Sequence, residues 1–380
     1  MRGHHGPTQL LAHPHSPRRA CRSARRPASG ALLRLRPAGP LRPRRRPDPP
    51  GRLRRDRRLY TFVEGNEPIN MALTTANTIQ HTASVLRRIA PDWMMTIADR
   101  YETLGTAVAA AYAGVPLIHV QGGEITGNID EKVRHAVTKL ADVHFVANTQ
   151  AQARVRQMGE HPSSVHVTGC PSIDIAREAM AMPIEEVQAA IDALGVGTHV
   201  DLRSDFLVVL QHPETDSYDH SYERMSATLD AVAEVGVPTI IFWPNVDAGS
   251  DATSKAIRVF RESGRFQKAH YIKNLEGHLF LRLLEQSRCL IGNSSVGIRE
   301  CSYMGTPVIN LGDRQHGRER GSNVIDCDWD ALAIRAAIET QLKHGRYPSS
   351  TIYGDGYAGE RIARMVQGLT KTTTKRFHEA

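Results

Sequence analysis

Cysteine is scarce and long apolar runs are missing from this chain of 380 residues, and both shortages narrow what the protein can be. The five cysteines lie far apart with no Cys-x-x-Cys pair, which argues against a disulfide framework or a structural zinc site and indicates a reducing cytoplasm. No run of about 18 apolar residues is present, so the sequence predicts no membrane span. No Gly-x-Gly-x-x-Gly opens a predicted helix and no metal-ligand spacing stands out. We therefore expect neither NAD, nor another cofactor, nor a metal.

Basic charge is concentrated at the start of the chain. Residues 1–58 contain 17 Arg, no Lys and only Asp48 and Asp56 as acids, a local sum of +15, whereas the whole chain carries +8. The remaining residues therefore sum to −7 (8 − 15), so the body of the protein is mildly acidic. Because residues 1–58 also hold ten of the 21 prolines and show no hydrophobic period, we predict that they are disordered.

Residues 1–58 allow other interpretations besides disorder. An Arg-rich arm can bind nucleic acid, but this one lacks interleaved aromatics and lysines, and a transit peptide would be richer in Ser and more amphipathic. Strings of Arg, Pro, Gly, Ala and His also arise when GC-rich DNA is translated out of frame. We expect a disordered or mistranslated segment, with no nucleic-acid and no membrane partner.

From Leu59 onward, short apolar runs alternate with longer helical patterns, which is typical of a parallel sheet flanked by helices. The predicted strands are 93–99, 115–120, 143–148 and 164–169 in a first series, and 205–213, 238–245, 269–273, 288–292 and 306–312 in a second. Two series predict an α/β fold of two doubly wound, Rossmann-like domains facing a cleft. We place these domains at 59–185 and 186–355, with a C-terminal helix and tail at 356–380 and the boundary in the polar, Gly-punctuated stretch 180–204.

Polar clusters follow nearly every predicted strand. In doubly wound sheets, ligands bind beyond the carboxyl ends of the strands, so this placement predicts a catalytic cleft there. The clusters are 99–100, 121–124, 212–215, 245–250 (with Asn245 and Asp247), 292–295 and 312–320.

Carboxylates gather after two neighbouring strands of the first series. Asp99 ends one strand, and Glu124 and Asp130 follow the next, with Arg134 and His135 on the helix predicted from about residue 131. Neighbouring carboxylates drive their pKa values apart, so one can act as an acid and another as a base. Asp130 also suits an ordinary acidic helix N-terminus, and both interpretations stay open.

The stretch GNSSVGIRECSYMG (292–305) places Ser294 and Ser295 at the start of a helix predicted over 295–304. Hydroxyls and free amides at a helix start suit a phosphate, and Glu300 could accept both hydroxyls of a ribose. An ordinary Ser cap with Glu300 on a solvated face is the equal alternative. Arg314 and Arg318 after the next strand favour phosphate, because arginine binds it bidentately, although that loop can also be simply solvated.

His212 directly follows an apolar strand and precedes Pro213, where the strand must end. A histidine at that edge can act as an acid toward a leaving phosphate near neutral pH. The alternative is a histidine hydrogen-bonded into the domain interface.

Several long motifs follow one another in a recognisable order. They are ADRYETLGTA (98–107), HVQGGEITGNIDEKVRHAVTK (119–139), QHPET (211–215), PNVDAGS (244–250), IGNSSVGIRE (291–300) and GTPVINLGDRQHGRERG (305–321). From about Leu59 to Thr370 the chain resembles the hydrolysing UDP-N-acetylglucosamine 2-epimerases, which begin sialic acid biosynthesis in bacteria and form the epimerase half of a bifunctional animal enzyme.

The resemblance implies a glycosyltransferase-B-like arrangement, with UDP held mainly by the second domain, in a homo-oligomer that is a dimer or a dimer of dimers. It implies cleavage of UDP-N-acetylglucosamine to N-acetylmannosamine and UDP, by anti elimination to a glycal and addition of water. Asp99 and Asp130 match carboxylates that act around C2, and His212 matches a histidine beside the departing phosphate. Positions that hold UDP are matched by Arg100, Asn245, Ser294, Ser295, Glu300 and Arg314.

Two departures from the family pattern bear on activity. Many members have a glutamate where this chain has Gln121, so that proton-transfer role is absent or passes to Glu124. Members also open with a strand and a Gly/Ser-Arg-Ala-Asp/Glu-Tyr-Gly loop whose arginine reaches the substrate phosphates. Residues 1–58 stand in that place, which predicts a lost strand and a frameshift or misassigned start upstream of Leu59.

Three alternatives to a hydrolysing epimerase stay open from the sequence. The first is a non-hydrolysing epimerase that releases UDP-N-acetylmannosamine. The second is an epimerase of a related UDP-diacetamido or GDP sugar, and the third is a nucleotide-sugar binder that turns nothing over.

Overall fold

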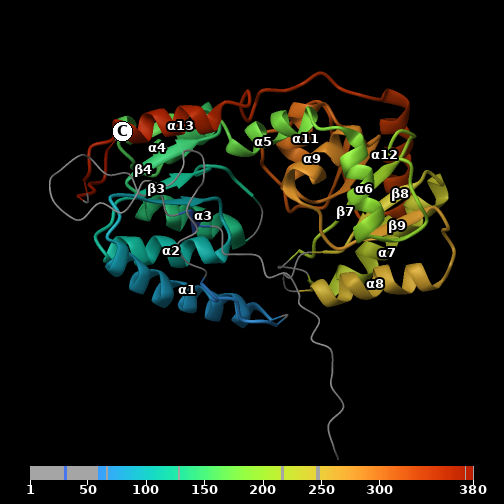
Figure 1. The fold of residues 1–380 in the computed structure, drawn as a ribbon, viewed down its shortest axis with the longest axis horizontal. Coiled ribbons are helices and arrows are strands. Elements are labelled where there is room, and N and C mark those ends of the chain that lie inside the picture. Colours follow the sequence, from blue (N-terminus) through green and yellow to red (C-terminus); the bar gives the residue numbers. More distant parts are fainter. Residues whose placement is uncertain are drawn as a thin grey trace, which may run out of the picture.

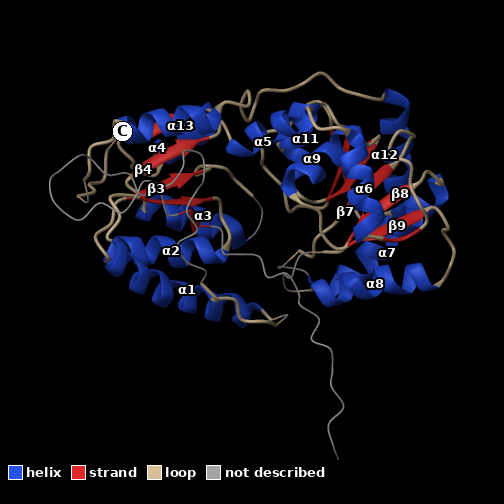
Figure 2. Cartoon of the chain, viewed as in Figure 1, coloured by secondary structure: helices blue, strands red, loops and turns tan. Residues whose placement is uncertain are grey.

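The structure, a computed structural model, describes residues 30–31, 59–65, 67–126, 129–214, 218–244, 249–372 and 374–379. Two sheets, each covered by helices, form two halves that lie side by side (Figure 1). Figure 2 shows the strands of both sheets enclosed between helices. The predicted α/β class with two doubly wound, Rossmann-like domains is confirmed. The predictions for residues 1–58 lie outside the described residues, apart from Gly30–Ala31.

The first domain is built on a sheet whose strands follow the order β1-β2-β3-β4-β5. The strands are β1 Gly30–Ala31, β2 Met94–Ile97, β3 Leu117–Val120, β4 Val143–Val146 and β5 Val165–Val167. Strands β2 to β5 run parallel, whereas β1 pairs antiparallel with β2. Every residue of β3 and β4 is buried, and apart from His119 and His144 these strands are apolar.

Helices cover both faces of this first sheet. They are α1 Pro68–Ile89, α2 Tyr101–Tyr112, α3 Ile129–Leu140, α4 Thr149–Gln157 and α13 Ala358–Gln367, with a 3₁₀ turn at Pro162–Ser164. Consecutive strand residues point to opposite faces, so Met94 packs toward α1, α2 and α3 while Met95 packs toward α13. The C-terminal helix thus completes the core of the first domain.

The second domain is built on a sheet of order β12-β11-β10-β7-β8-β9-β6. The strands are β6 Val196–Gly197, β7 Leu207–Leu210, β8 Thr239–Phe242, β9 Ala269–Ile272, β10 Cys289–Gly292, β11 Val308–Leu311 and β12 Val324–Cys327. The helices are α5 Pro171–Met180, α6 Ile184–Leu194, α7 Ser221–Val235, α8 Ser250–Glu262, α9 Gly277–Gln286, α10 Ser295–Ile298, α11 Glu300–Met304 and α12 Ala331–His344, with a 3₁₀ turn at Tyr218–His220. The strand order reverses between β7 and β10, and such a switch point is where doubly wound sheets bind ligands.

Two passages of the chain join the domains and lie against each other. The first leads through Gly169 into α5, and the second returns through Gly354 to α13, along the top of the view in Figure 1. A Cβ on Gly169 would lie 3.2 Å from the Cα of Gly354, so both glycines permit a close approach. The Cys170 N–H donates to the Tyr353 carbonyl at 2.7 Å, which joins the passages directly.

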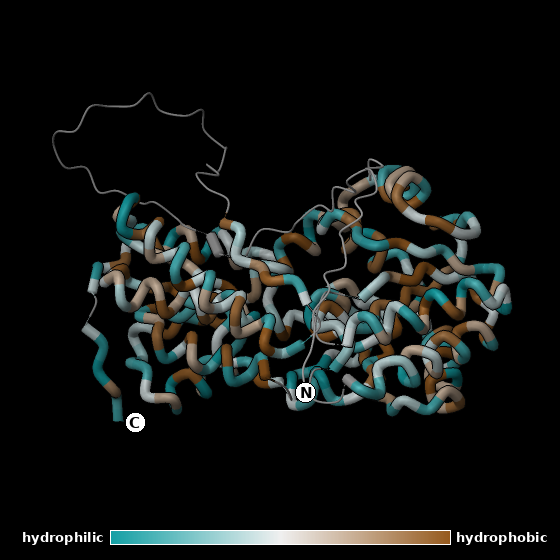
Figure 3. The backbone as a smooth tube through the Cα atoms, turned by 90° about the horizontal axis from the view of Figure 1, so that it is seen from below, coloured by the Kyte–Doolittle hydropathy of each residue, from teal (hydrophilic) through white to brown (hydrophobic). Residues whose placement is uncertain are grey.

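Hydrophobic (brown) stretches alternate with hydrophilic (teal) ones through both domains in Figure 3. The stretch 180–204, in which the sequence places the domain boundary, contains α6. Val187 and Ile191, one turn apart on α6, are fully buried, and this narrow stripe suffices to dock the helix. Within the described residues, no helix is long and apolar enough to cross a membrane.

Candidate functional site

The carboxyl edge of the first sheet carries a buried cluster of ion pairs. Asp99 follows β2, and its carboxylate pairs with Arg134 on α3, a guanidinium that is 1% exposed. Arg318 of the second domain approaches the same carboxylate, with 3.6 Å between its Nη2 and Oδ2 of Asp99. Burial alone would raise the pKa of Asp99, but the arginines, Arg134 first, lower it to about 2. Asp99 is therefore ionised at neutral pH and can accept a proton.

Glu124 lies in the loop after β3, and only 1% of it is exposed. Its Oε2 is 3.4 Å from Nη1 of Arg318 and 3.6 Å from Nη1 of Arg299, and both arginines come from the second domain. Neither carboxylate oxygen of Glu124 has a hydrogen-bond partner among the described residues. Two cations of one domain thus hold a carboxylate of the other whose lone pairs stay available to a proton or a hydroxyl group.

A hydrogen-bonded bridge spans the switch point of the second sheet. His212 follows β7, and its backbone N–H donates to Oδ1 of Asn293, which follows β10, at 2.8 Å. The Asn293 side-chain amide donates back to the His212 carbonyl, also at 2.8 Å. Gln315 and Arg314 donate to the Asn293 carbonyl at 2.9 and 3.4 Å. This bridge fixes the His212 backbone beside the start of α10.

The helix after β10 breaks at Arg299 into α10 and α11, so the prediction of one helix over 295–304 is wrong. Ser294 is the residue before α10 and Ser295 is its first residue, as predicted. Arg299 donates to Oγ of Ser295 at 3.0 Å, and its Nε lies 3.8 Å from Oε2 of Glu300. Glu300 is only 6% exposed, which rules out a solvated face. The break turns Arg299 toward Glu124 across the domain interface.

The remaining predicted site residues lie around these two clusters or outside the described residues. Asp130 and His135 lie on α3, and His135 pairs with a glutamate one turn earlier, 3.5 Å from its Nε2. Arg100 precedes α2 and pairs with a nearby glutamate at 3.2 Å, so its guanidinium is engaged within the first domain. Asn245 and Asp247 lie outside the described residues.

Sequence reasoning missed Arg299 and Asn293 as site residues. A signal was present for both, since an arginine directly follows the apolar residues Val-Gly-Ile of the predicted helix and an asparagine lies within the predicted phosphate loop. Gln121 directly follows β3, and its amide donates to Sγ of Cys170 at 2.7 Å. The side chain at position 121 is therefore turned toward the passage between the domains.

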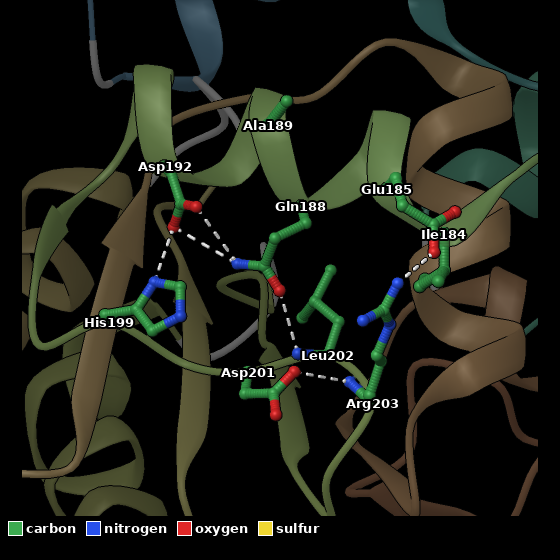
Figure 4. Close-up of a pocket in the computed structure, with 9 residues that line it drawn as sticks. All are labelled: Ile184, Glu185, Gln188, Ala189, Asp192, His199, Asp201, Leu202 and Arg203. Atoms are coloured by element: carbon green, nitrogen blue, oxygen red, sulfur yellow. Dashed lines mark hydrogen bonds and ion pairs between the residues drawn. The ribbon is translucent and has the colours of Figure 1, made fainter.

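Figure 4 shows a separate pocket of about 360 Å³ between α6 and the segment 198–204. Its polar groups satisfy one another: Asp192 pairs with His199 at 2.9 Å, and Glu185 pairs with Arg203 at 2.5 Å. A second pocket of about 220 Å³ opens beside Arg320, after β11 and β12. Within the described residues, no group of three His, Cys, Asp or Glu side chains is placed to hold a metal ion.

The profile of a known family, described as UDP-N-acetylglucosamine 2-epimerase, matches residues 58–367 of this chain. The chain belongs to the UDP-N-acetylglucosamine 2-epimerase family. The range matched by the epimerase profile includes every helix of both domains and every strand except β1. All the residues of the two clusters described above fall within this range.

Curated members of the family share about a quarter to a third of their residues with this chain. The UDP-N-acetylglucosamine 2-epimerase of Neisseria meningitidis is 28% identical over 331 residues, covering 86% of this chain and 80% of its own. A UDP-N,N'-diacetylbacillosamine 2-epimerase (hydrolyzing) of Legionella pneumophila is 29% identical over 300 residues, covering 79% and 77%. The polysialic acid biosynthesis protein P7 of Escherichia coli is 32% identical over 281 residues, covering 71% and 69%.

Solved structures of epimerases share the fold. The UDP-GlcNAc 2-epimerase from Neisseria meningitidis, solved bound to UDP-GlcNAc, matches with a TM-score of 0.67 at 19% identity, covering 81% of this chain and 84% of its own. The enzyme from Methanocaldococcus jannaschii, solved with UDP-GlcNAc and UDP, also matches with a TM-score of 0.67, at 17% identity over 79% and 82% of the two chains. Both likenesses support the glycosyltransferase-B-like arrangement.

Proposed function

We propose that this chain is a hydrolysing 2-epimerase that converts UDP-N-acetylglucosamine to N-acetylmannosamine and UDP. The proposal is carried by a buried cluster of ion pairs between the domains. In it, Asp99 and Glu124 of the first domain lie against Arg318 and Arg299 of the second. It brings carboxylate acceptors and guanidinium donors together at one place, within a family of epimerases. Hydrolysing relatives, such as the bacillosamine enzyme of Legionella pneumophila, favour the hydrolysing branch.

In the proposed elimination, a carboxylate removes the proton from C2 of the sugar while UDP departs with the electron pair of the C1–O bond. Asp99 is assigned the acceptor role, because its carboxylate is ionised at neutral pH and lies beside the guanidinium groups of Arg134 and Arg318. His212, with Ser294, Ser295 and Arg314 nearby, is assigned to the departing phosphate, where donors stabilise the negative charge that develops.

In the proposed second step, water adds its oxygen to C1 of the glycal, and a proton returns to C2 from the opposite face. This step requires a second acid–base group. Gln121 cannot fill it, because an amide does not take up a proton at neutral pH. We assign the role to Glu124 or Asp130, and assign Arg100, Arg134, His135, Asn245, Asp247, Glu300 and Arg318 to substrate binding.

The test is proton NMR of the purified full chain with UDP-N-acetylglucosamine in D₂O. Free N-acetylmannosamine with deuterium at C2, together with free UDP, is the expected result. UDP-N-acetylmannosamine as the product would replace the hydrolysing branch with the non-hydrolysing one. Binding of UDP without turnover by a folded sample would refute the enzyme and leave a nucleotide-sugar binder. UDP-N,N'-diacetylbacillosamine is tested in parallel, because relatives carry that name.

The His212→Ala variant tests the assignment at the phosphate. We expect kcat to fall by about 100-fold or more, the usual effect of losing a general acid, with the UDP dissociation constant within about threefold of wild type. His199→Ala is the matched control, because its imidazole is 63% exposed beside a different pocket. An unchanged rate in His212→Ala would remove that residue from the mechanism.

We propose that the chain forms a homo-oligomer through α1. From Pro68 to Leu86 this helix carries no charged residue, and it exposes Ile69 by 55% and Leu73 by 47%. Figure 1 shows α1 as the outermost helix of its domain. An uncharged, partly apolar helix face suits contact with the same face of a second copy. Light scattering after size exclusion tests this, and a monomeric mass would refute it.

A further inference from the structure

Two residues at the carboxyl edge of the first sheet adopt a left-handed backbone conformation that residues with a side chain rarely take. Ala98 and Gln121 both have φ of 69°, directly after β2 and β3. Such conformations persist only where the surrounding contacts hold them, and they gather at functional sites. Ala98 immediately precedes Asp99. The contacts that hold Ala98 therefore also aim the Asp99 carboxylate.

His119 on β3 supplies the contact that holds Ala98. The imidazole is fully buried, with its Nε2 3.1 Å from the Ala98 carbonyl oxygen and its Nδ1 3.1 Å from Oγ1 of Thr138 on α3. Because a carbonyl oxygen can only accept, Nε2 carries the hydrogen, and Nδ1 accepts from the Thr138 hydroxyl. The Ala98 N–H donates to the Val120 carbonyl at 3.0 Å. Both backbone polar groups of Ala98 are thus bound to β3.

The imidazole stays neutral at any pH at which the enzyme would work. Burial lowers the pKa of His119 to about 3; the hydrogen bond to Ala98 and the charge of Asp99 act against this shift, and His144 and Arg134 add to it. Gly122 allows the close fit, since a Cβ there would lie 3.0 Å from Nδ1 of His119. A neutral ring of fixed tautomer donates to the backbone without placing a second cation beside Arg134.

We propose that His119 is a positioning residue: its Nε2–H holds the Ala98 carbonyl and thereby fixes the Asp99 carboxylate against Arg134, in the orientation that accepts the substrate proton. The inference rests on the proposed function, because its purpose is to orient a reacting carboxylate. His119 acts only through Asp99, since its ring nitrogens are both engaged within the protein.

Two substitutions separate the two nitrogens of the ring. His119→Gln can place an amide N–H near the position of Nε2 and keep the bond to Ala98. His119→Asn reaches only the position of Nδ1, and so loses that bond. We expect His119→Asn to lower kcat by about 10- to 100-fold with KM within about threefold, because a small misplacement of a reacting group costs rate rather than binding. His119→Gln should stay within about fivefold of wild type.

A purely structural role is excluded by a control and by the pH profile. Val137→Ala removes two methyl groups from a fully buried side chain of α3 that is outside the site, so it lowers the urea midpoint and leaves kcat unchanged. The acidic limb of kcat/KM should move to higher pH in His119→Asn, because Asp99 released from Arg134 holds its proton more tightly. It should not move in Val137→Ala.

The tautomer is measured without substrate, by ¹⁵N NMR of the histidine-labelled full chain. We expect His119 to remain the neutral Nε2–H form from about pH 5 to pH 8. Equal kcat in the Asn and Gln variants, or titration of His119 near its ordinary pKa, would overturn the proposal. A wild-type chain that turns over no nucleotide sugar would refute the proposed function instead, and the tautomer would still decide whether His119 holds Ala98.

Discussion

Replacing Lys375 by methionine should destabilise the first domain strongly, although Lys375 lies five residues from the end of the chain. Its Nζ donates to the carbonyls of Thr138, Lys139 and Ala141, at 3.1, 2.9 and 2.6 Å, at the C-terminal end of α3. It also pairs with Oε2 of the buried Glu160 at 2.7 Å. One ammonium group therefore satisfies the last carbonyls of a helix and neutralises a buried carboxylate.

The magnitude follows from these contacts. A hydrogen bond to a charged group contributes about 1.5–3 kcal/mol, but contacts that share one ammonium do not add, and ordering a lysine costs about 2 kcal/mol of side-chain entropy. Lys139 remains as a second cation on Glu160, at 2.7 Å, so the carboxylate is not left unpaired. Methionine keeps the apolar stem. We expect the free energy of unfolding to fall by about 2–3 kcal/mol.

The assay is urea unfolding of the full chain at neutral pH, followed by circular dichroism. Lys371→Met is the matched control, because Lys371 lies in the same tail, is 54% exposed and makes a single surface pair with Asp92 at 3.4 Å. Such a pair contributes about 0.5 kcal/mol, so the control should barely move the midpoint. Equal midpoints for the two variants would refute the reasoning that the tail is clamped through Lys375.

Two further predictions concern the same domain. Burial opposes ionisation of Glu160, but hydrogen bonds from His144 and from lysines lower its pKa from 4.5 to about 2. Glu160→Gln should therefore lower the free energy of unfolding by about 3 kcal/mol at pH 7. Urea titrations should show this loss shrinking as the pH falls from about 4.5 toward 2. Gly123 has φ of 77°, and a Cβ added there would lie 2.3 Å from a backbone oxygen of α4. Gly123→Ala should therefore lower the melting temperature by several degrees. Gly114→Ala is the control, because φ there is 64° with open space around the Cβ; a similar loss in both would mean that φ alone, and not the close approach, sets the cost.

Some elements of the fold were predictable because burial on both faces leaves a plain signature. β7 and β10 are buried at every position and read as apolar runs that end at polar clusters. The long helix α1 was missed for the opposite reason. It packs on α2 with a stripe of buried threonines, Thr74, Thr78 and Thr82, at intervals of one turn. A search for apolar periodicity does not register a stripe of hydroxyl-bearing side chains.

The site was predictable only up to the domain interface. The predicted ends of the strands gave the correct positions of Asp99 after β2 and His212 after β7, since the carboxyl ends of parallel strands lie at one edge of a sheet. The partners of Arg318 could not be derived in the same way. Arg318 is buried against Asp99 and Glu124 of the other domain, and this depends on how the two domains dock, which no local spacing encodes. Its burial also shows that the alternative of a simply solvated loop is wrong at that position.

The paired passages at Gly169 and Gly354 have a consequence for synthesis on the ribosome. The second domain is enclosed in the sequence between them, while α13, whose Ile362 and Val366 complete the core of the first domain, is made after it. Domains fold as units while the chain emerges. We therefore expect the second domain to reach its native state first, and the first domain to stay incomplete until α13 has been synthesised. The order of folding would then be the reverse of the order in which the two domains are encoded.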